Sequence, residues 1–182
     1  MTATENGQEL VVLLDDQRRP IGTAPKADVH TTDTPLHLAF SSYAFDPAGQ
    51  KVLVTRRALG KKTWPGVWTN TCCGHPGPGE DLQDAMVRRI GQELGLVPKD
   101  VELALPDFAY TARMADGIME NEFCPVFRVV VDADPEPDPA EVAEWAWVDW
   151  ADLVVVAERA PWLISPWAAL QIPQLSRFSR EP

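Results

Sequence analysis

The pattern of apolar and polar residues predicts several strands and two helices. Four stretches rich in apolar and β-branched residues are expected to be strands: 9–14, 36–45, 51–57 and 141–148. Two longer stretches, 101–113 and 117–131, indicate a hairpin that turns at 114–117, and the Pro- and Asp-rich segment 132–140 connects it to the last strand. The strands come from all along the chain, which indicates one mixed assembly of sheets and helices.

A helix is expected over 81–94, because its apolar residues recur at spacings of three and four: Leu82, Ala85, Met86, Ile90 and Leu94. Gly95 provides a natural C-terminal stop. Ser165 and Pro166 predict the start of a second helix, which Pro173 is expected to bend or end. Residues 58–80 are rich in Gly and Pro and are expected to form a long loop, which in a compact domain is usually functional. The fold class is α+β or a mixed α/β layer fold.

Composition narrows the protein class. The 182 residues suit a single domain (1–182) whose ends, 1–8 and 179–182, are expected to be flexible. A net charge of −11 argues against nucleic-acid binding. No apolar run reaches the roughly 18–20 residues that cross a bilayer, and no signal peptide is visible, so a membrane partner is not expected. Three cysteines, an odd number, disfavour a disulfide framework and fit a reducing cytoplasm.

The segment TNTCCGHPGPGE (69–80) places a thiol and an imidazole close together. Cys73 lies two residues before His75, in a Gly- and Pro-rich loop that leads directly into the predicted helix. The other two histidines, His30 and His37, lie upstream on or near a predicted strand. The thiol of Cys73 could act as a nucleophile or proton donor, and the imidazole of His75 could bind a metal ion. Their position just before a charged helix indicates an active site.

Two carboxylates are expected on one face of a strand. Glu120 and Glu122 are two residues apart, and Cys124 and Val126 continue the same face with apolar groups. By position alone a solvated strand face is the simpler interpretation, but carboxylates against a core need a metal, a cation or a proton. Together with the three histidines they would fill the mixed N/O shell of a divalent first-row ion, although spacing alone does not bring them together.

The predicted helix carries part of a known motif. Arg89 and Glu93 lie one turn apart, either as a surface ion pair or as ligands of a phosphate and a second cation. Gly74, Glu80, Arg88, Ile90, Glu93, Gly95 and Leu96 have the spacing of a Nudix box. Arg89 and Gln92 stand where that motif has glutamates, which disfavours diphosphate hydrolysis because fewer carboxylates hold fewer metal ions. The upstream basic segment TRRALGKKTWPGVW is either a solvated loop or a diphosphate contact.

These residues together resemble the type 1 isopentenyl-diphosphate isomerases, the metal-dependent class with a Nudix fold. The resemblance runs from about Leu10 to Trp167, through HTTDTPLHLAFSSYAF, VTRRALGKKTWPGVWTNTCCGHP, the degenerate box, MENEFCPVF and SPW. It implies a Nudix-like α+β fold in which mixed β-sheets are sandwiched with helices. It also implies a 1,3-allylic proton shift that converts isopentenyl diphosphate to dimethylallyl diphosphate through a tertiary carbocation.

The resemblance also implies a role for each site residue. The catalytic residues would be Cys73, Glu122, Tyr110 and Trp167, and the diphosphate contacts Arg57, Lys61 and Arg89. The first metal site, for Mn²⁺ or Mg²⁺ and sometimes Zn²⁺, would use His30, His37, His75, Glu120 and Glu122. Glu93 would hold a second Mg²⁺ that arrives with the substrate. The protein is expected to be a monomer or weak dimer, and the resemblance leaves open which of Cys73 and Glu122 donates the proton.

Two other functions stay possible from the sequence. A Nudix diphosphohydrolase would use the same helix and release phosphate. A non-catalytic module would bind a metal or a diphosphate without turnover, which the pair of Cys73 and Glu122 argues against.

Overall fold

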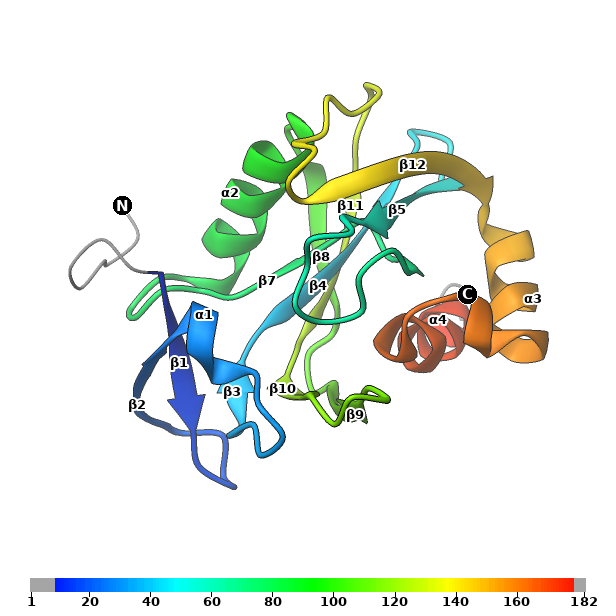
Figure 1. Cartoon of the computed structure of the whole chain (residues 1–182). Coiled ribbons are helices and arrows are strands. Elements are labelled where there is room, and N and C mark those ends of the chain that lie inside the picture. The colour runs from blue at the N-terminus through cyan, green and yellow to red at the C-terminus, as the bar shows by residue number, and fades with distance from the viewer. Residues whose placement is uncertain (1–8, 179–182) are drawn as a thin grey trace.

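The computed structural model of the chain describes residues 9–178, which fold into two mixed β-sheets and four α-helices (Figure 1). The ends that were expected to be flexible, 1–8 and 179–182, lie outside these residues. Within residues 9–178, each helix is too short or too polar to cross a membrane.

The larger sheet has seven strands and separates two layers of helices. Its main strands are, in spatial order, β12 (Val142–Asp149), β5 (Lys51–Arg57), β4 (Phe40–Phe45), β11 (Val126–Val130) and β8 (Lys99–Leu105). Two short strands extend it, because β6 (Trp68–Thr69) pairs with β5 and β7 (Cys72–Gly74) pairs with β4. β4 and β11 are parallel, and the other pairs are antiparallel.

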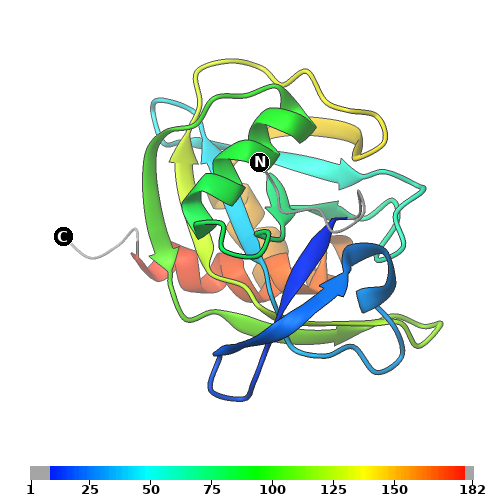
Figure 2. The same ribbon diagram turned by 90° about the vertical axis from the view of Figure 1, so that its left-hand side faces the viewer.

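The smaller sheet has five strands and lies beside the first (Figure 2). In spatial order they are β2 (Pro20–Pro25), β1 (Leu10–Leu14), β3 (His37–Leu38), β10 (Met119–Phe123) and β9 (Ala109–Arg113). β3 and β10 run parallel and continue into β4 and β11 of the larger sheet, which are also parallel. The pairing sets His37 and Tyr110 on either side of Glu122, so the three side chains share one face of the sheet.

Helices cover both faces of the larger sheet. α2 (Leu82–Leu94) lies on one face, and α3 (Trp150–Arg159) and α4 (Pro166–Phe178) lie on the other (Figures 1 and 2). Along β4, Phe40 and Ala44 pack in the core under α2, while Tyr43 and Phe45 pack in the core under α3 and α4. The short α1 (Lys26–Val29) and the 3₁₀ helix η1 (Pro161–Leu163) complete the elements of the described residues.

The predicted helix over 81–94 is confirmed as α2. The carboxylate of Asp81 accepts hydrogen bonds from the backbone N–H groups of Gln83 and Asp84 and so caps the first turn. Gly95 ends the helix with a φ of 66°, a left-handed conformation that glycine adopts without strain. The apolar face predicted from the spacing is buried except for Leu82, which is partly buried, and Arg89 and Glu93 are buried with it.

The long stretches 101–113 and 117–131 form the expected hairpin only in the parts nearest to the turn. β9 and β10 pair antiparallel across the predicted turn, whereas β8 and β11 belong to the larger sheet. Each stretch changes sheet near a proline, Pro106 or Pro125, which cannot donate to a ladder hydrogen bond. These prolines therefore mark where the chain passes between sheets.

Other local predictions need correction. The loop 58–80 contains β6 and β7, which were not expected, and β2, α1 and α3 had no prediction. Pro173 does not end the last helix, since α4 continues through it to Phe178. Ile172 and Leu175, on either side of Pro173, are buried in the core, so tertiary packing outweighs the lost backbone hydrogen bond.

Candidate active site

A cavity of about 460 Å³ receives side chains from both sheets and from α2 and α4. All of the site residues predicted from the sequence line it except His37, which lies directly behind His75 and Glu122 in a shared cluster. Three groups of side chains line the cavity: an imidazole–carboxylate cluster, a partly buried thiol beside aromatic rings, and a set of cationic side chains.

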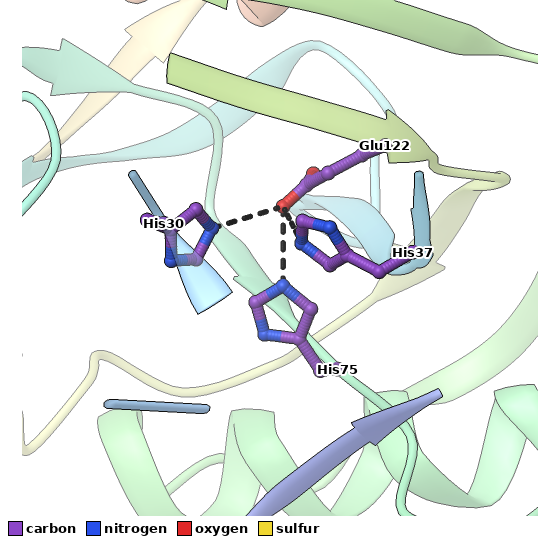
Figure 3. Close-up of side chains that lie close together, drawn as sticks. All are labelled: His30, His37, His75 and Glu122. Atoms are coloured by element: carbon purple, nitrogen blue, oxygen red, sulfur yellow. Dashed lines mark hydrogen bonds and ion pairs between the residues drawn. The ribbon is translucent and has the colours of Figure 1, made fainter. Parts of the chain in front are cut away.

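The three histidines converge on one carboxylate oxygen (Figure 3). His30 follows α1, His37 lies in β3 and His75 follows β7, so the fold gathers them from distant parts of the chain. Their Nε2 atoms lie 4.0, 3.4 and 3.1 Å from Oε1 of Glu122. The four ligand atoms are all within 4.8 Å of one another, which is the arrangement that a single bound ion requires.

The donor atoms of this cluster fit a divalent metal ion. Nδ1 of His37 lies 2.9 Å from the carbonyl of Pro35, which can only accept, so in the neutral ring Nε2 keeps its lone pair. The Nε2 atoms of His30 and His37 are buried without a hydrogen-bond partner. Buried polar atoms are rarely left unpaired, and three nitrogens with one carboxylate oxygen suit a first-row ion.

The electrostatics favour the metal-binding protonation states of Glu122 and His75. For His37, burial favours the neutral ring, but its contact with Glu122 outweighs burial and raises the pKa of His37. Burial opposes ionisation of Glu122, but its polar contacts with the three imidazoles outweigh burial and hold the pKa of Glu122 well below its usual range. Burial lowers the pKa of His75 to about 4, so this ring is neutral at neutral pH. A carboxylate and a neutral imidazole are the forms that coordinate a cation.

Glu120 lies beside the four-residue cluster rather than within it. Its carboxyl group contacts the hydroxyl of Tyr110, which also lies 2.9 Å from Oε2 of Glu122. Burial and the charge of Glu122 raise the pKa of Glu120. The Tyr110 hydroxyl has a single hydrogen, which it can donate to only one of the two carboxyl groups. If Glu120 is protonated, it can donate to the Tyr110 oxygen while Tyr110 donates to Glu122, so that each of the three oxygens has a hydrogen-bond partner.

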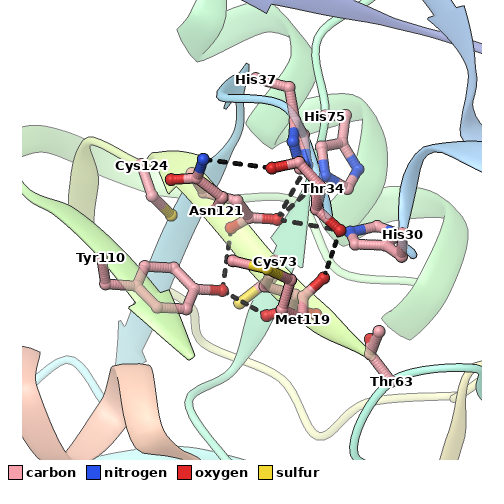
Figure 4. Close-up of polar contacts among 12 residues, drawn as sticks. His30, Thr34, His37, Thr63, Cys73, His75, Tyr110, Met119, Asn121 and Cys124 are labelled. Atoms are coloured by element: carbon pink, nitrogen blue, oxygen red, sulfur yellow. Dashed lines mark hydrogen bonds and ion pairs between the residues drawn. The ribbon is translucent and has the colours of Figure 1, made fainter. Parts of the chain in front are cut away.

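The thiol of Cys73 faces the same cavity from β7 (Figure 4). Its Sγ lies 3.2 Å from Oδ1 of Asn70 and 3.3 Å from Oγ of Ser41. Burial raises the pKa of Cys73 to about 12, so the group is a neutral thiol. A Cβ on Gly74 would come within 2.9 Å of the Phe40 ring and 3.0 Å of Arg89, so only glycine allows the strand to pass this closely.

Aromatic rings close the cavity on the side of α4. Trp167 is buried, and its ring centroid lies 5.9 Å from that of Tyr110 and 5.5 Å from that of Trp64. Its indole Nε1 donates a hydrogen bond of 2.9 Å to Oδ1 of Asn70, which fixes the orientation of the ring. An aromatic face held in this way can stabilise a positive charge in the cavity.

Five cationic side chains, called here the cationic wall, line the same cavity as the histidine cluster. They are Lys26, Arg57, Lys61, Lys62 and Arg89. The guanidinium of Arg57 bonds twice to the carbonyl of Thr63 at 3.0 and 2.8 Å, which holds the loop after β5. The remaining basic residue of the segment 55–68, Arg56, pairs with Glu144 and does not line the cavity.

The surviving carboxylate of the degenerate box is also in the cavity. Glu93 is buried and forms an ion pair with Arg89 within α2. Arg88, by contrast, pairs with Glu80 at 2.7 Å at the start of the helix. One carboxylate next to a guanidinium is therefore all that α2 offers to a cation here.

Sequence reasoning missed a set of buried polar residues behind the thiol. Asn70 contacts Cys73 and Trp167, and Ser41 lies 3.3 Å from the sulfur atoms of both Cys73 and Cys124. Gln171 of α4 donates to Oγ of Ser41 at 2.9 Å. Asn70 lies two residues before the CCGH segment, and this proximity is the only feature of the sequence that could have identified it as a site residue. Nothing in the sequence identifies Gln171.

Comparison with known proteins gives consistent results. A NUDIX domain model matches residues 35–170. Proteins named isopentenyl-diphosphate Delta-isomerase from Frankia alni and Paenarthrobacter aurescens are 63% identical over 162 residues and 56% identical over 177 residues. The alignments cover 89% of this chain and 83% of the first protein, and 97% and 96% for the second.

Solved structures show the same fold at low identity. The chain is similar to DR0079 from Deinococcus radiodurans, with a TM-score of 0.70 and 16% identity over 92% of this chain and 99% of that one. It is also similar to the NUDIX domain of NrtR from Shewanella oneidensis, with a TM-score of 0.58 and 18% identity over 79% and 88% of the two chains.

Proposed function

The chain belongs to the isopentenyl-diphosphate Delta-isomerases, a family of NUDIX-domain proteins, and from this we propose how its cavity moves a double bond. It is an isomerase of isoprenoid biosynthesis that interconverts isopentenyl diphosphate and dimethylallyl diphosphate. The observation that carries the proposed mechanism is that a protonated thiol and an ionised carboxylate, Cys73 and Glu122, line the same cavity.

The cationic wall is proposed to bind the diphosphate. Arg57, Lys61 and Arg89 line the cavity, and guanidinium and ammonium groups bind phosphate oxygens well. Glu93 would hold a Mg²⁺ that arrives with the substrate, since it is the carboxylate of α2 that faces the cavity. Binding the diphosphate at this wall leaves the hydrocarbon end of the substrate between the thiol and the carboxylate cluster.

The histidine cluster is proposed to hold Mn²⁺ or Mg²⁺, with Zn²⁺ as a further possibility for these donors. His30, His37, His75 and Glu122 would be its ligands, with Glu120 adjacent. When bound, the ion would supply a fixed positive charge that holds Glu122 in place and lowers its basicity. Tyr110 would keep the free oxygen of Glu122 aligned through its hydroxyl.

The reaction needs one proton held between two groups. Cys73 carries a proton and Glu122 does not, so one group can add a proton to the terminal carbon while the other removes one from the methylene carbon on the far side of the resulting cationic carbon. Protonation of the alkene creates a tertiary carbocation. The ring of the buried Trp167 would stabilise that cation by about 2 kcal/mol. The bound substrate would have to exclude water from the cavity, so that water does not capture the cation.

A single incubation separates isomerisation from diphosphate hydrolysis, the reaction that the sequence alone left open. With isopentenyl diphosphate and Mg²⁺, we expect proton and phosphorus NMR to show dimethylallyl diphosphate and no released phosphate. A chelator should abolish the conversion, and excess Mg²⁺ or Mn²⁺ should restore it. Release of phosphate, or full conversion in the chelator, would overturn the proposal; an unchanged substrate signal would support a non-catalytic binding module.

The dependence of kcat/KM on pH should report the ionisation of Lys61 in the cationic wall. Burial is the main cause that lowers the pKa of Lys61 to about 8, and Arg57, Lys26 and Arg89 lower it further. Above that pH, Lys61 is neutral and loses its charge-assisted contact to the diphosphate, so kcat/KM should fall by about tenfold or more. In Lys61→Arg this alkaline limb should move to higher pH. A profile that stays flat to about pH 9.5, or an unmoved limb in Lys61→Arg, would contradict this role.

Three coarser features complete the proposal. We expect residues 1–182 to form one domain, because the NUDIX match spans 35–170 and β4 is covered on both faces. A cytoplasmic location fits three free cysteines. A monomer or weak dimer, with small-molecule substrates and neither nucleic acid nor membrane as partner, fits a self-contained cavity and a net charge of −11.

A further inference from the structure

Asn70 connects two residues of the site that the chain places far apart. It lies between β6 and β7, is fully buried and does not line the cavity. Its Oδ1 accepts hydrogen bonds from the Cys73 thiol at 3.2 Å and from the Trp167 indole at 2.9 Å. A third donor, the Thr69 hydroxyl, lies 2.7 Å from the same oxygen.

The orientation of the Asn70 amide is fixed from both ends. Its Nδ2 lies 3.0 Å from the carbonyl of Ser42 and 2.9 Å from that of Cys72, and carbonyls only accept. The indole of Trp167 only donates, so it must face the amide oxygen. The oxygen is therefore the atom next to Cys73, and the sulfur can bond to it only by donating its hydrogen.

We infer that Asn70 is a positioning residue for the isomerase reaction, which sets the direction of the Cys73 S–H bond and the plane of the Trp167 ring through one shared oxygen. The inference rests on the proposed roles of Cys73 and Trp167. Because both donors meet at one atom, the distance between the proton-transfer group and the cation-facing ring is set by a single rigid side chain.

Ser42 offers a matched control. Its hydroxyl donates to the carbonyl of Cys72 at 3.0 Å, the same carbonyl that Asn70 binds, and it too is fully buried. It does not line the cavity. Ser42→Ala therefore removes a buried hydrogen bond from the same peptide while leaving the contacts of Asn70 to thiol and indole in place.

The test combines kinetics with infrared spectroscopy of the S–H stretch of Cys73, assigned by its absence in Cys73→Ala. In Asn70→Ala we expect kcat to fall by about 30- to 100-fold and KM to change by less than about threefold, since the cationic wall is untouched. The S–H band should move to higher frequency as its acceptor is lost. Ser42→Ala should keep kcat within about threefold and leave the band unmoved.

Asn70→Asp keeps the question answerable if the alanine variant does not fold. A buried carboxyl group that faces two carbonyls is expected to stay neutral, which preserves the acceptor oxygen for thiol and indole. We expect its S–H band to match that of the unmodified protein and its kcat to lie within about tenfold.

Either of two results would overturn the inference. The first is an S–H band of Cys73 that does not move in Asn70→Ala, and the second is the loss of that band in a folded Asn70→Asp variant. A loss of kcat in Ser42→Ala equal to that in Asn70→Ala would also overturn it, since the effect would then belong to packing. An unmodified protein without isomerase activity refutes the proposed function instead, and the band still reports whether Asn70 holds the thiol.

Discussion

Replacing Cys73 with alanine is expected to lower kcat by at least about a thousandfold, while the Kd for isopentenyl diphosphate changes by less than about threefold. The thiol is protonated and faces the cavity, so its removal takes away one of the two groups that exchange protons with the substrate. The proposed diphosphate contacts are other side chains of the cavity, and the substitution leaves them in place. Steady-state kinetics and calorimetric titration of the substrate measure the two quantities separately.

Cys72→Ala is the control for this variant. The two cysteines are adjacent and both line the cavity, but Cys72 packs in the core under α2, whereas Cys73 packs against the core under α3 and α4. We expect Cys72→Ala to reduce stability slightly through the lost packing and to leave kcat within about threefold. Near-normal turnover in Cys73→Ala, or equal losses in both variants, would reject the thiol as a proton-transfer group.

Replacing Glu122 with glutamine is expected to remove both metal binding and turnover. The change keeps the shape but loses the charge at the point where three imidazoles converge, and a neutral amide can neither balance a divalent ion nor accept a proton. We expect Mn²⁺ affinity, measured by titration calorimetry, to fall by more than about a hundredfold and kcat at saturating Mn²⁺ by more than about a thousandfold.

Glu120→Gln separates the two carboxylates. Because Glu120 bonds to Tyr110 and stands outside the four-atom cluster, its loss should weaken Mn²⁺ binding by about 10- to 100-fold, the range for a group that supports a ligand. If Glu120→Gln lost the ion as completely as Glu122→Gln, Glu120 would be a direct ligand, as the family resemblance implies. If Glu122→Gln kept normal Mn²⁺ affinity, the proposed metal centre would be wrong.

Local patterns predicted much of this fold because the physics behind them is local. The spacing of Ala85, Met86, Ile90 and Leu94 defined α2, and Gly95 ended it as expected. The period of two along β10 placed Glu120 and Glu122 on one buried face. These elements follow from backbone geometry and burial that a few neighbouring residues determine.

Long-range packing decided what the sequence left open. α3 contains three consecutive valines, which are weak helix formers, but burial of Leu153 and Ala157 on one face favours the helix. Pro173 sits inside α4 because core contacts hold both neighbouring turns. Which hydrogen-bond partners lie behind Cys73 depends on Asn70 and Ser41 meeting residues of α4 in space, and no spacing in the chain shows that.

The most direct test of the mechanism is the fate of solvent deuterium. In D₂O with Mg²⁺ and isopentenyl diphosphate, the unmodified protein should place deuterium on the terminal carbon, and mass spectrometry should find it in the new methyl group of dimethylallyl diphosphate. Cys73→Ala and Glu122→Gln, at matched protein concentration and saturating substrate, should incorporate none above background. Deuterium uptake at the normal rate in either variant would show that protons move without that group and would contradict the account.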